Sequence, residues 1–211
     1  MIRWSRNILA QEIRFTMGKW CVIVGLVFRA MLSGQNAHSE SSAQTGHDGR
    51  EHGAWLEIFK DRLPLYGHRN WVVIADSAYP DQSRDGIETV IAHENQLAVL
   101  RTVLAVLSES RHVRPIVYTD QELPLVDESD APGVSDYRAQ LAGILNGQPA
   151  NALPHEQIIG KLDDVSKTFR VLIIKTTLTI PYTSVFLQLD CAYWSADAEA
   201  RLRAKMAGQT K

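Results

Sequence analysis

The chain has 211 residues, of which 45% are hydrophobic and 22% are charged, and its formal net charge at pH 7 is −2. This is the composition of an ordinary globular protein, and one folded domain is expected. A net charge close to zero provides no basic surface for a phosphate backbone, which argues against nucleic acid as a partner. Only two cysteines are present, Cys21 and Cys191, which excludes a disulfide framework and a zinc site built from cysteines.

The first 37 residues differ in character from the rest of the chain. Basic residues precede a short apolar run at 20–28, and small polar residues follow it. The run is too short to span a bilayer, and the pattern predicts a secretory signal peptide that starts at Met17 and is cleaved after Ala37. The alternative is an upstream region that belongs only to the gene model. If the signal peptide is real, the protein is expected to be periplasmic or otherwise exported, and if it is not, the protein is expected to be cytoplasmic. No membrane span is expected in the mature form.

Residues 38–53 are rich in Ser, Gly, His and Gln and contain almost no apolar side chain. Such a segment cannot offset its ordering entropy by burial, which predicts a disordered linker. His47 and His52 lie within it, and we expect them to be solvated, because a mobile segment lacks the fixed geometry of a metal site. The folded domain is expected at 54–211.

The folded domain alternates helical and strand-like patterns. Apolar residues recur with a helical period from Trp55 to Leu65, until Pro64 and Gly67 end the helix. The continuous apolar run at 71–75 predicts a strand that is buried on both faces, as in a parallel sheet. The further predicted elements are strands at 87–92, 113–118, 171–176 and 185–189, helices at 96–108, 134–145, 154–169 and 195–206, and a surface loop at 119–133. This order predicts an α/β fold, a three-layer sheet with helices on both faces.

Familiar catalytic motifs are absent from the sequence, which has no G-x-G-x-x-G, P-loop, H-E-x-x-H or G-x-S-x-G. The candidate residues are therefore polar side chains at the ends of predicted elements. His68 lies in the turn before the strand at 71–75, Asp76 follows that strand, His155 lies near a helix start, and Tyr182 precedes the last strand. Each of them also has a purely structural explanation, because turns and helix ends routinely use such residues.

In combination these residues resemble the D-ribose pyranase and L-fucose mutarotase family. The resemblance spans residues 60–190 and depends on Gly67-His68, a strand that ends in Asp76, His155-Glu156-Gln157 and Pro181-Tyr182. Family members carry a Leu-Gly-His element, a strand ending in Asp, a His-Glu-Gln element and a Pro-Tyr-Ala-Asn element. The sequence departs from that pattern at Asn70, Leu178 and Ser184, where the family often has Asp, Glu and Asn. The resemblance implies a divergent member whose sugar is not specified.

The resemblance implies a sugar isomerase that interconverts the anomers or ring forms of a free monosaccharide. Such a reaction needs a base for the anomeric hydroxyl and an acid for the ring oxygen, and imidazole can serve as either near neutral pH. We expect His68 and His155 to transfer protons, Asp76 to orient an imidazole or bind a hydroxyl, and Tyr182 to offer its phenol to the sugar. Lys175 and Ser184 are expected to contact substrate. No metal, nucleotide or redox cofactor is required.

The family resemblance also implies a ring-shaped homo-oligomer with each pocket at a subunit boundary. Two alternatives remain open from the sequence. The first is a non-catalytic sugar-binding protein, in which loss of the family's Asp and Asn at positions 70 and 184 has removed turnover. The second is a structural oligomer whose pocket is vestigial.

Overall fold

The computed structural model describes residues 48–209. The predicted signal peptide and most of the predicted linker lie outside the described residues. The helices are α1 (Asp48–Arg62), α2 (Gln96–Glu109), α3 (Val134–Leu145), α4 (His155–Val165) and α5 (Ala196–Gln209), with short 3-10 turns at Leu63–Leu65 and Leu123–Leu125. The strands are β1 (Trp71–Ala75), β2 (Ile87–Ile91), β3 (Val113–Asp120), β4 (Ala150–Leu153), β5 (Val171–Lys175) and β6 (Val185–Cys191). No helix in this part of the chain has the length and apolar character needed to cross a membrane.

The strands of the described residues form one six-stranded sheet in the order β2-β5-β1-β6-β3-β4. The pairs β2–β5, β5–β1 and β3–β4 are parallel, whereas β6 runs antiparallel to both of its neighbours, β1 and β3. The carboxyl ends of all strands except β6 therefore meet at one edge of the sheet, and β6 begins at that edge. We call it the carboxyl edge, and the opposite one the amino edge.

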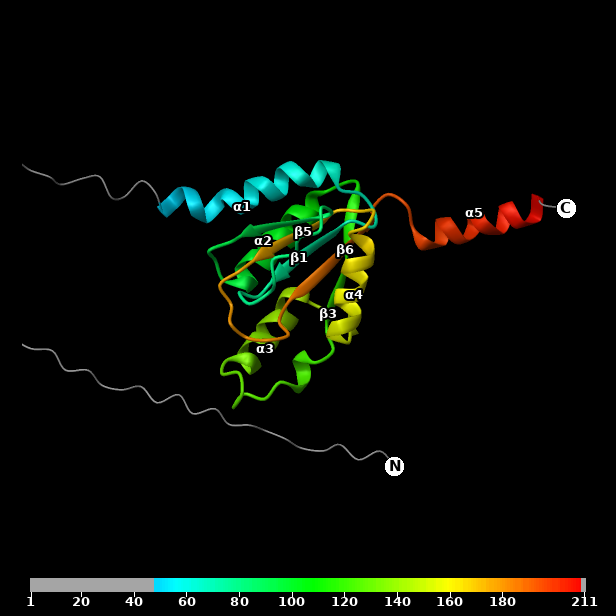
Figure 1. Cartoon of the computed structure of the whole chain (residues 1–211). Helices are drawn as coiled ribbons and strands as arrows, with labels where there is room; N and C mark the ends of the chain where they lie inside the picture. Colours follow the sequence, from blue (N-terminus) through cyan, green and yellow to red (C-terminus); the bar gives the residue numbers. More distant parts are fainter. Residues whose placement is uncertain (1–47, 210–211) are drawn as a thin grey trace, which may run out of the picture. The chain divides into compact units, whose positions relative to one another are not determined.

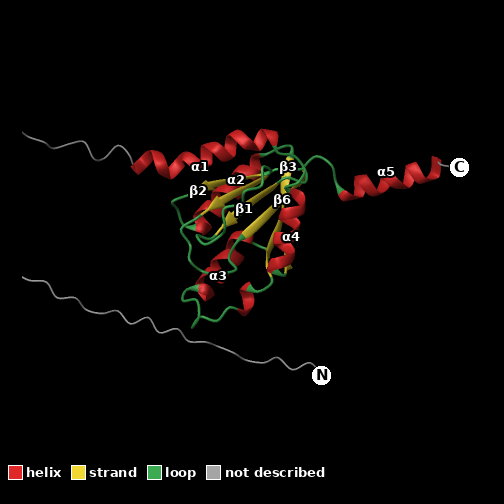
Figure 2. Cartoon of the chain, in the orientation of Figure 1, coloured by secondary structure: helices red, strands yellow, loops and turns green. Residues whose placement is uncertain are grey.

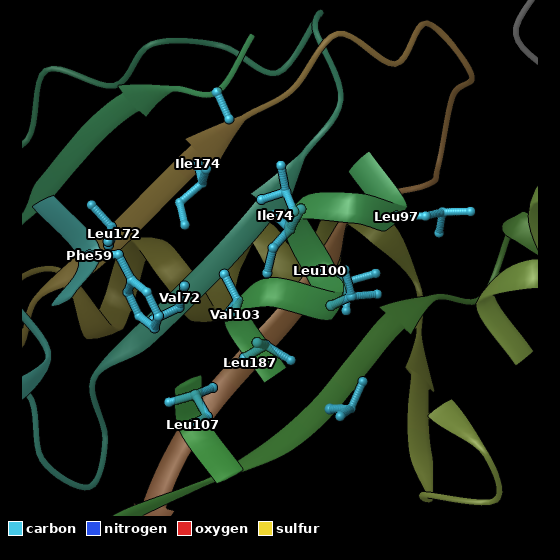
Figure 3. Packing of buried hydrophobic residues seen from close by; sticks show 14 of the residues in the cluster. Phe59, Val72, Ile74, Leu97, Leu100, Val103, Leu107, Leu172, Ile174 and Leu187 are labelled. Carbon is cyan, nitrogen blue, oxygen red and sulfur yellow. The ribbon is translucent and has the colours of Figure 1, made fainter. Parts of the chain in front are cut away.

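One face of the sheet is covered by α1, α2 and α3 (Figure 1, Figure 2). Side chains alternate between the two faces along a strand, so that Val72 and Ile74 of β1 point to this face. There they belong to the same buried cluster as Phe59 of α1 and Leu100 of α2, which Figure 3 shows from close by. The helical period predicted around Phe59 is thus the packing face of α1.

The other face is covered by α4. Trp71 and Val73 of β1 point to this face, where they share a buried cluster with Ile158 and Leu162 of α4 and Phe186 of β6. All five residues of β1 are buried, as the continuous apolar run predicts. Helices thus lie on both faces of the sheet, and the predicted three-layer α/β architecture is confirmed.

Several predicted boundaries are wrong, and each difference has a physical reason. The helix α1 begins at Asp48, inside the segment predicted to be a linker, because extending a formed helix costs far less than nucleating one. The predicted surface loop at 119–133 begins too early, because β3 continues to Asp120, which is buried. The predicted helix at 154–169 is shorter, since α4 ends at Val165.

The edge strand β4 was not predicted. Its sequence, Ala-Asn-Ala-Leu, lacks β-branched residues, and its side chains are largely exposed. It is a strand because it pairs in parallel with the end of β3, where Asp120 is opposite Leu153. This pairing comes from tertiary structure and overrides the weak local preference of the segment. It also places the residues that follow β4 beside the end of β3.

Candidate active site at the carboxyl edge of the sheet

A cavity of about 480 Å³ opens at the carboxyl edge of the sheet. Its size is that of a site for one small molecule, and its position is the one where ligands collect in open α/β sheets. The lining residues come from the loop after β1, the start of α4 and the loop between β5 and β6. They are Asp76, Ser77, Ala78, Tyr79, Pro80, Gln82, His155, Glu156, Ile159, Thr179, Ile180, Pro181 and Tyr182.

His155 is the first residue of α4 and contacts a buried carboxylate at the end of β3. The pairing of Asp120 with Leu153 leaves one residue, Pro154, between β4 and the histidine. Nδ1 of His155 lies 3.1 Å from Oδ1 of Asp120, within hydrogen-bond distance. A carboxylate at Nδ1 holds the proton on that nitrogen and leaves Nε2 as the nitrogen that can exchange a proton with a bound molecule.

Glu122 fixes the backbone at the same point. The N–H of His155 donates to both carboxylate oxygens of Glu122, each at 3.1 Å. This N–H belongs to the first turn of α4, where a helix lacks internal acceptors and where negative charge is favourable. The end of β3 holds the ring of His155 through Asp120, and the segment after β3 holds its backbone through Glu122.

The carboxyl group of Asp120 is held in an unfavourable environment for its charge. Burial raises its pKa from 3.8 to about 6, and the hydrogen bond from His155 opposes that rise. Its second oxygen, Oδ2, is buried and has no hydrogen-bond partner among the described residues. Buried carboxylates without full pairing are costly and are found disproportionately at functional sites.

Tyr182 lies against His155 from the loop between β5 and β6. The two ring centroids are 5.6 Å apart and the ring planes meet at 86°, an edge-to-face contact. Tyr182 is 40% exposed, and its φ of 58° is in the left-handed region. That conformation costs a non-glycine residue about 1–2 kcal/mol, so the surrounding structure must hold the tyrosine in place.

Asp76 is a further polar group at the cavity. It follows β1 directly, and its Oδ1 accepts a hydrogen bond from the N–H of Ala78 at 2.9 Å, which shapes the turn beneath the cavity. Its Oδ2 accepts a hydrogen bond from the hydroxyl of Ser184 at 3.2 Å. Ser184 is buried and does not line the cavity. It therefore contacts Asp76 from the side away from the cavity.

His68 lies far from this cavity within one chain. It precedes β1 whereas Asp76 follows it, and five extended residues span about 16 Å at ~3.3 Å per residue. At the amino edge, exposed His68 lines a different hollow of about 540 Å³, together with Arg69 and Arg114. Lys175 ends β5 at the carboxyl edge but does not line the cavity around His155. Of the predicted residues, the structure thus brings together Asp76, His155 and Tyr182, with Ser184 behind them.

The sequence reasoning missed Asp120, Glu122 and Tyr79. Asp120 and Glu122 were assigned to a surface loop, although the apolar segment before Asp120 ends in an acid just as the strand before Asp76 does. That parallel was the available signal. Tyr79 lines the cavity and is 4% exposed, and burial raises the pKa of its hydroxyl above the usual range.

The described residues contain no group of three or more His, Cys, Asp and Glu side chains arranged to hold a metal ion. The chemistry that the observed groups themselves can perform is proton transfer. An oriented imidazole, a phenol in contact with it and a nearby carboxylate can accept and donate protons at adjacent oxygens of one small molecule.

No protein-family model matches the sequence, and the search of curated proteins found no match. Several solved structures are similar to the chain. RbsD of Bacillus subtilis complexed with D-ribose is 22% identical, with 63% of this chain and 91% of that chain covered and a TM-score of 0.44. The fucose mutarotase of Streptococcus pneumoniae in complex with L-fucose is 20% identical, with coverages of 69% and 97% and a TM-score of 0.43. FucU of Bifidobacterium longum is 17% identical, with coverages of 64% and 94% and a TM-score of 0.44.

Proposed function

We propose that the protein is a monosaccharide isomerase of the mutarotase or pyranase type. The observation that carries this proposal is the hydrogen bond between His155 and the buried Asp120 beside Tyr182, in a cavity sized for one small molecule. The resemblance of Gly67-His68, Asp76, His155-Glu156-Gln157 and Pro181-Tyr182 to the pyranase and mutarotase pattern supports the same reaction.

In the proposed reaction, Nε2 of His155 removes the proton of the anomeric hydroxyl. The bond between the anomeric carbon and the ring oxygen breaks, and the phenol of Tyr182 gives its proton to that ring oxygen. The open-chain aldehyde rotates, and ring closure from either face returns the proton to Tyr182 and takes the other from His155. Asp120 stabilises the imidazolium that forms in between. No atom is gained or lost, and no cofactor takes part.

The residues around the cavity favour an uncharged sugar. Asp76 and Glu156 contribute carboxylates, and none of the described residues that line the cavity is a lysine or an arginine. A phosphorylated sugar or a uronate would be repelled there, since its negative charge has no partner. Ile159 and Ile180 provide apolar surface for the C–H face of a sugar ring.

A second copy of the chain is the proposed source of His68. The hollow at the amino edge contains His68, three arginines and two acids, Asp190 and Glu199, whereas the cavity at the carboxyl edge contains Asp76 and Glu156 and no lysine or arginine. Contact between the net positive amino edge and the negative carboxyl edge is a head-to-tail interface, which closes into a ring when the rotation permits. This agrees with the ring-shaped homo-oligomer that the sequence resemblance implies.

A sugar-binding protein without turnover is the second candidate, and the position of Ser184 favours it. The hydroxyl of Ser184 is directed to Asp76, so it cannot replace the amide that the family pattern carries at that position. Asn70 likewise serves a turn, because its side chain accepts from the N–H of Gly67 and donates to the carbonyl of Arg170. In this alternative the cavity binds a monosaccharide and leaves its anomer exchange unchanged.

The test is saturation-transfer NMR of ribose, fucose and related free sugars with and without the protein. The proposal expects faster exchange between anomers or ring forms for at least one sugar, and loss of that acceleration in His155→Gln. The matched control is His93→Gln, which changes an exposed histidine outside the cavity. Binding of a sugar without faster exchange would support the sugar-binding protein without turnover. If no sugar binds and no exchange is accelerated, both candidate functions are contradicted.

A further inference from the structure

A cluster of buried polar groups lies beneath the loop at 176–184, which carries Tyr182. Gln96 begins α2, Tyr137 belongs to α3, and Thr183 follows Tyr182 in the loop. Gln96 and Thr183 are fully buried and Tyr137 is 4% exposed. We call these three residues the buried triangle. Buried polar groups are costly unless paired, so the contacts within the triangle determine what it does.

The three groups are joined by a closed set of hydrogen bonds. The side-chain amide of Gln96 donates to the hydroxyl of Tyr137 at 3.0 Å and to the carbonyl of Thr183. The hydroxyl of Tyr137 donates to the same carbonyl at 2.7 Å. Burial raises the pKa of Tyr137 above its usual range, so its hydroxyl keeps its proton and remains a donor at every pH near neutrality. Two helices thus bind one backbone oxygen.

That backbone oxygen lies next to a strained turn. The hydroxyl of Thr183 donates to the carbonyl of Ile180 at 2.7 Å, with Pro181 and Tyr182 between them. Proline is favoured at the first central position of such a turn, but a positive φ at the second normally requires glycine or asparagine. Tyr182 has this positive φ, so contacts outside the turn must stabilise it.

The triangle lies outside the cavity. Tyr137 belongs to the buried cluster beneath α1, α2 and α3, whereas the cavity residues Tyr79 and Ile159 pack in the cluster beneath α4. None of the three residues of the triangle lines the cavity, so they do not touch a molecule bound there. Its effect on the site passes through the backbone between Tyr182 and Thr183.

We propose that Gln96 and Tyr137 are positioning residues that hold the ring of Tyr182 against His155 by binding the carbonyl of Thr183. The effect of these residues on reaction rate rests on the proposed function. Their effect on the geometry of Tyr182 and His155 does not, and it can be measured without any sugar.

The test uses the full-length protein with its histidines labelled with carbon-13 at Cε1. The edge-to-face contact with Tyr182 places the His155 ring in the aromatic field of the phenol, and its Cε1–H resonance is assigned as the one that disappears in His155→Gln. Tyr182→Leu gives the position of this resonance without the contact. Tyr137→Phe, which removes a single oxygen atom, is expected to move the resonance toward that position. Gln96→Met, which removes the other donor, is expected to move it in the same direction and decides the question if Tyr137→Phe does not fold.

The matched control is Tyr66→Phe, which removes a hydroxyl from another tyrosine that is 4% exposed but precedes β1 at the amino edge, whereas the loop at 176–184 follows β5 at the carboxyl edge. It should leave the His155 resonance in place. A folded Tyr137→Phe protein with an unchanged His155 resonance would overturn the proposal, whatever sugar the protein binds.

The rate measurement separates the two proposals. With the sugar that responds to the wild-type protein, Tyr137→Phe is expected to lower kcat about 10- to 100-fold with little change in KM, because misplacement of a reacting group affects mainly the transition state. A shifted resonance with an unchanged rate would support the positioning and remove Tyr182 from the proposed reaction.

Discussion

The carboxylate of Asp120, whose side chain is fully buried, lies 3.1 Å from Nδ1 of His155, whose side chain is 32% exposed. The pair thus has one member that water and substrate cannot reach and one that faces the cavity. In such a pair the buried acid orients the accessible imidazole and stabilises its charged form. The raised pKa of Asp120 shows that burial of its negative charge is unfavourable in the folded state.

Removing the charge of Asp120 should slow anomer exchange without weakening the binding of sugar in the cavity. Asp120→Asn keeps the size of the side chain but cannot stabilise an imidazolium, so the rate of anomer exchange should fall about 10- to 100-fold, within the range that acid–base groups contribute. Saturation-transfer NMR measures the rate, and a sugar titration should give a similar affinity. The control Asp136→Asn alters an exposed acid on α3, and an equal loss in both variants would contradict the prediction.

The rate of exchange should increase with pH through about 6. Asp120 must be ionised to stabilise the imidazolium that forms on His155, and burial raises its pKa to about 6. Below that pH the carboxyl group is protonated and the imidazole loses its anionic partner. A pH profile of wild type and Asp120→Asn measures this directly. If the same ionisation near pH 6 persists in the variant, it belongs to another group.

Stability should show the opposite dependence on pH. The pKa of Asp120 is about 6 in the folded state and has its ordinary value of 3.8 when exposed, so the folded state binds more protons between these values. Stability from this group is therefore present below pH 4 and is lost as pH rises to about 6, by up to about 3 kcal/mol. Urea unfolding at pH 4 and pH 7 measures this loss. From pH 4 to pH 7, the free energy of unfolding of Asp120→Asn should rise relative to that of wild type by an amount of that order. No gain would contradict the raised pKa.

Two inactive variants should restore activity when mixed, if His68 acts on the cavity of a neighbouring copy. His155→Gln removes the proposed base at the carboxyl edge, and His68→Ala removes the amino-edge histidine that a neighbouring copy would bring to that cavity. After joint unfolding and refolding, some interfaces pair an intact amino edge with an intact carboxyl edge, and part of the exchange activity should return. Full activity of His68→Ala alone would remove this histidine from the reaction.

Gly86 should tolerate no side chain, because the loop after α4 lies directly against it. A Cβ atom added there would lie 2.0 Å from the carbonyl oxygen of Ser166, a backbone atom that cannot move aside cheaply. Gly86→Ala should destabilise the protein by about 2 kcal/mol or more, in the range of overpacking. In Gly160→Ala, in the interior of α4, the new Cβ meets nothing within 4 Å, and the variant should gain up to about 1 kcal/mol. Thermal unfolding compares the two, and equal effects would contradict the argument.

Elements with strong local patterns could be predicted from the order of residues alone. The uninterrupted apolar run of β1 predicts burial on both faces, and the helical period from Trp55 predicts the packing face of α1. The boundaries of α3 and β1 agree with the predicted ones, since Asn146 and Asp76 are residues that end such elements. Asp76, His155 and Tyr182 were identified because each stands at the end of an element, where polar side chains are free to project.

Which of those residues meet depends on the fold. Asp120 joins His155 because β4, a segment with no strand preference of its own, pairs with the end of β3. His68 does not join them within one chain, because a whole strand separates it from Asp76. Sequence patterns report the environment along a single element, whereas register and strand order depend on contacts between residues that are distant in sequence. These contacts form the site, and so the pairing of Asp120 with His155 can be identified only from the fold.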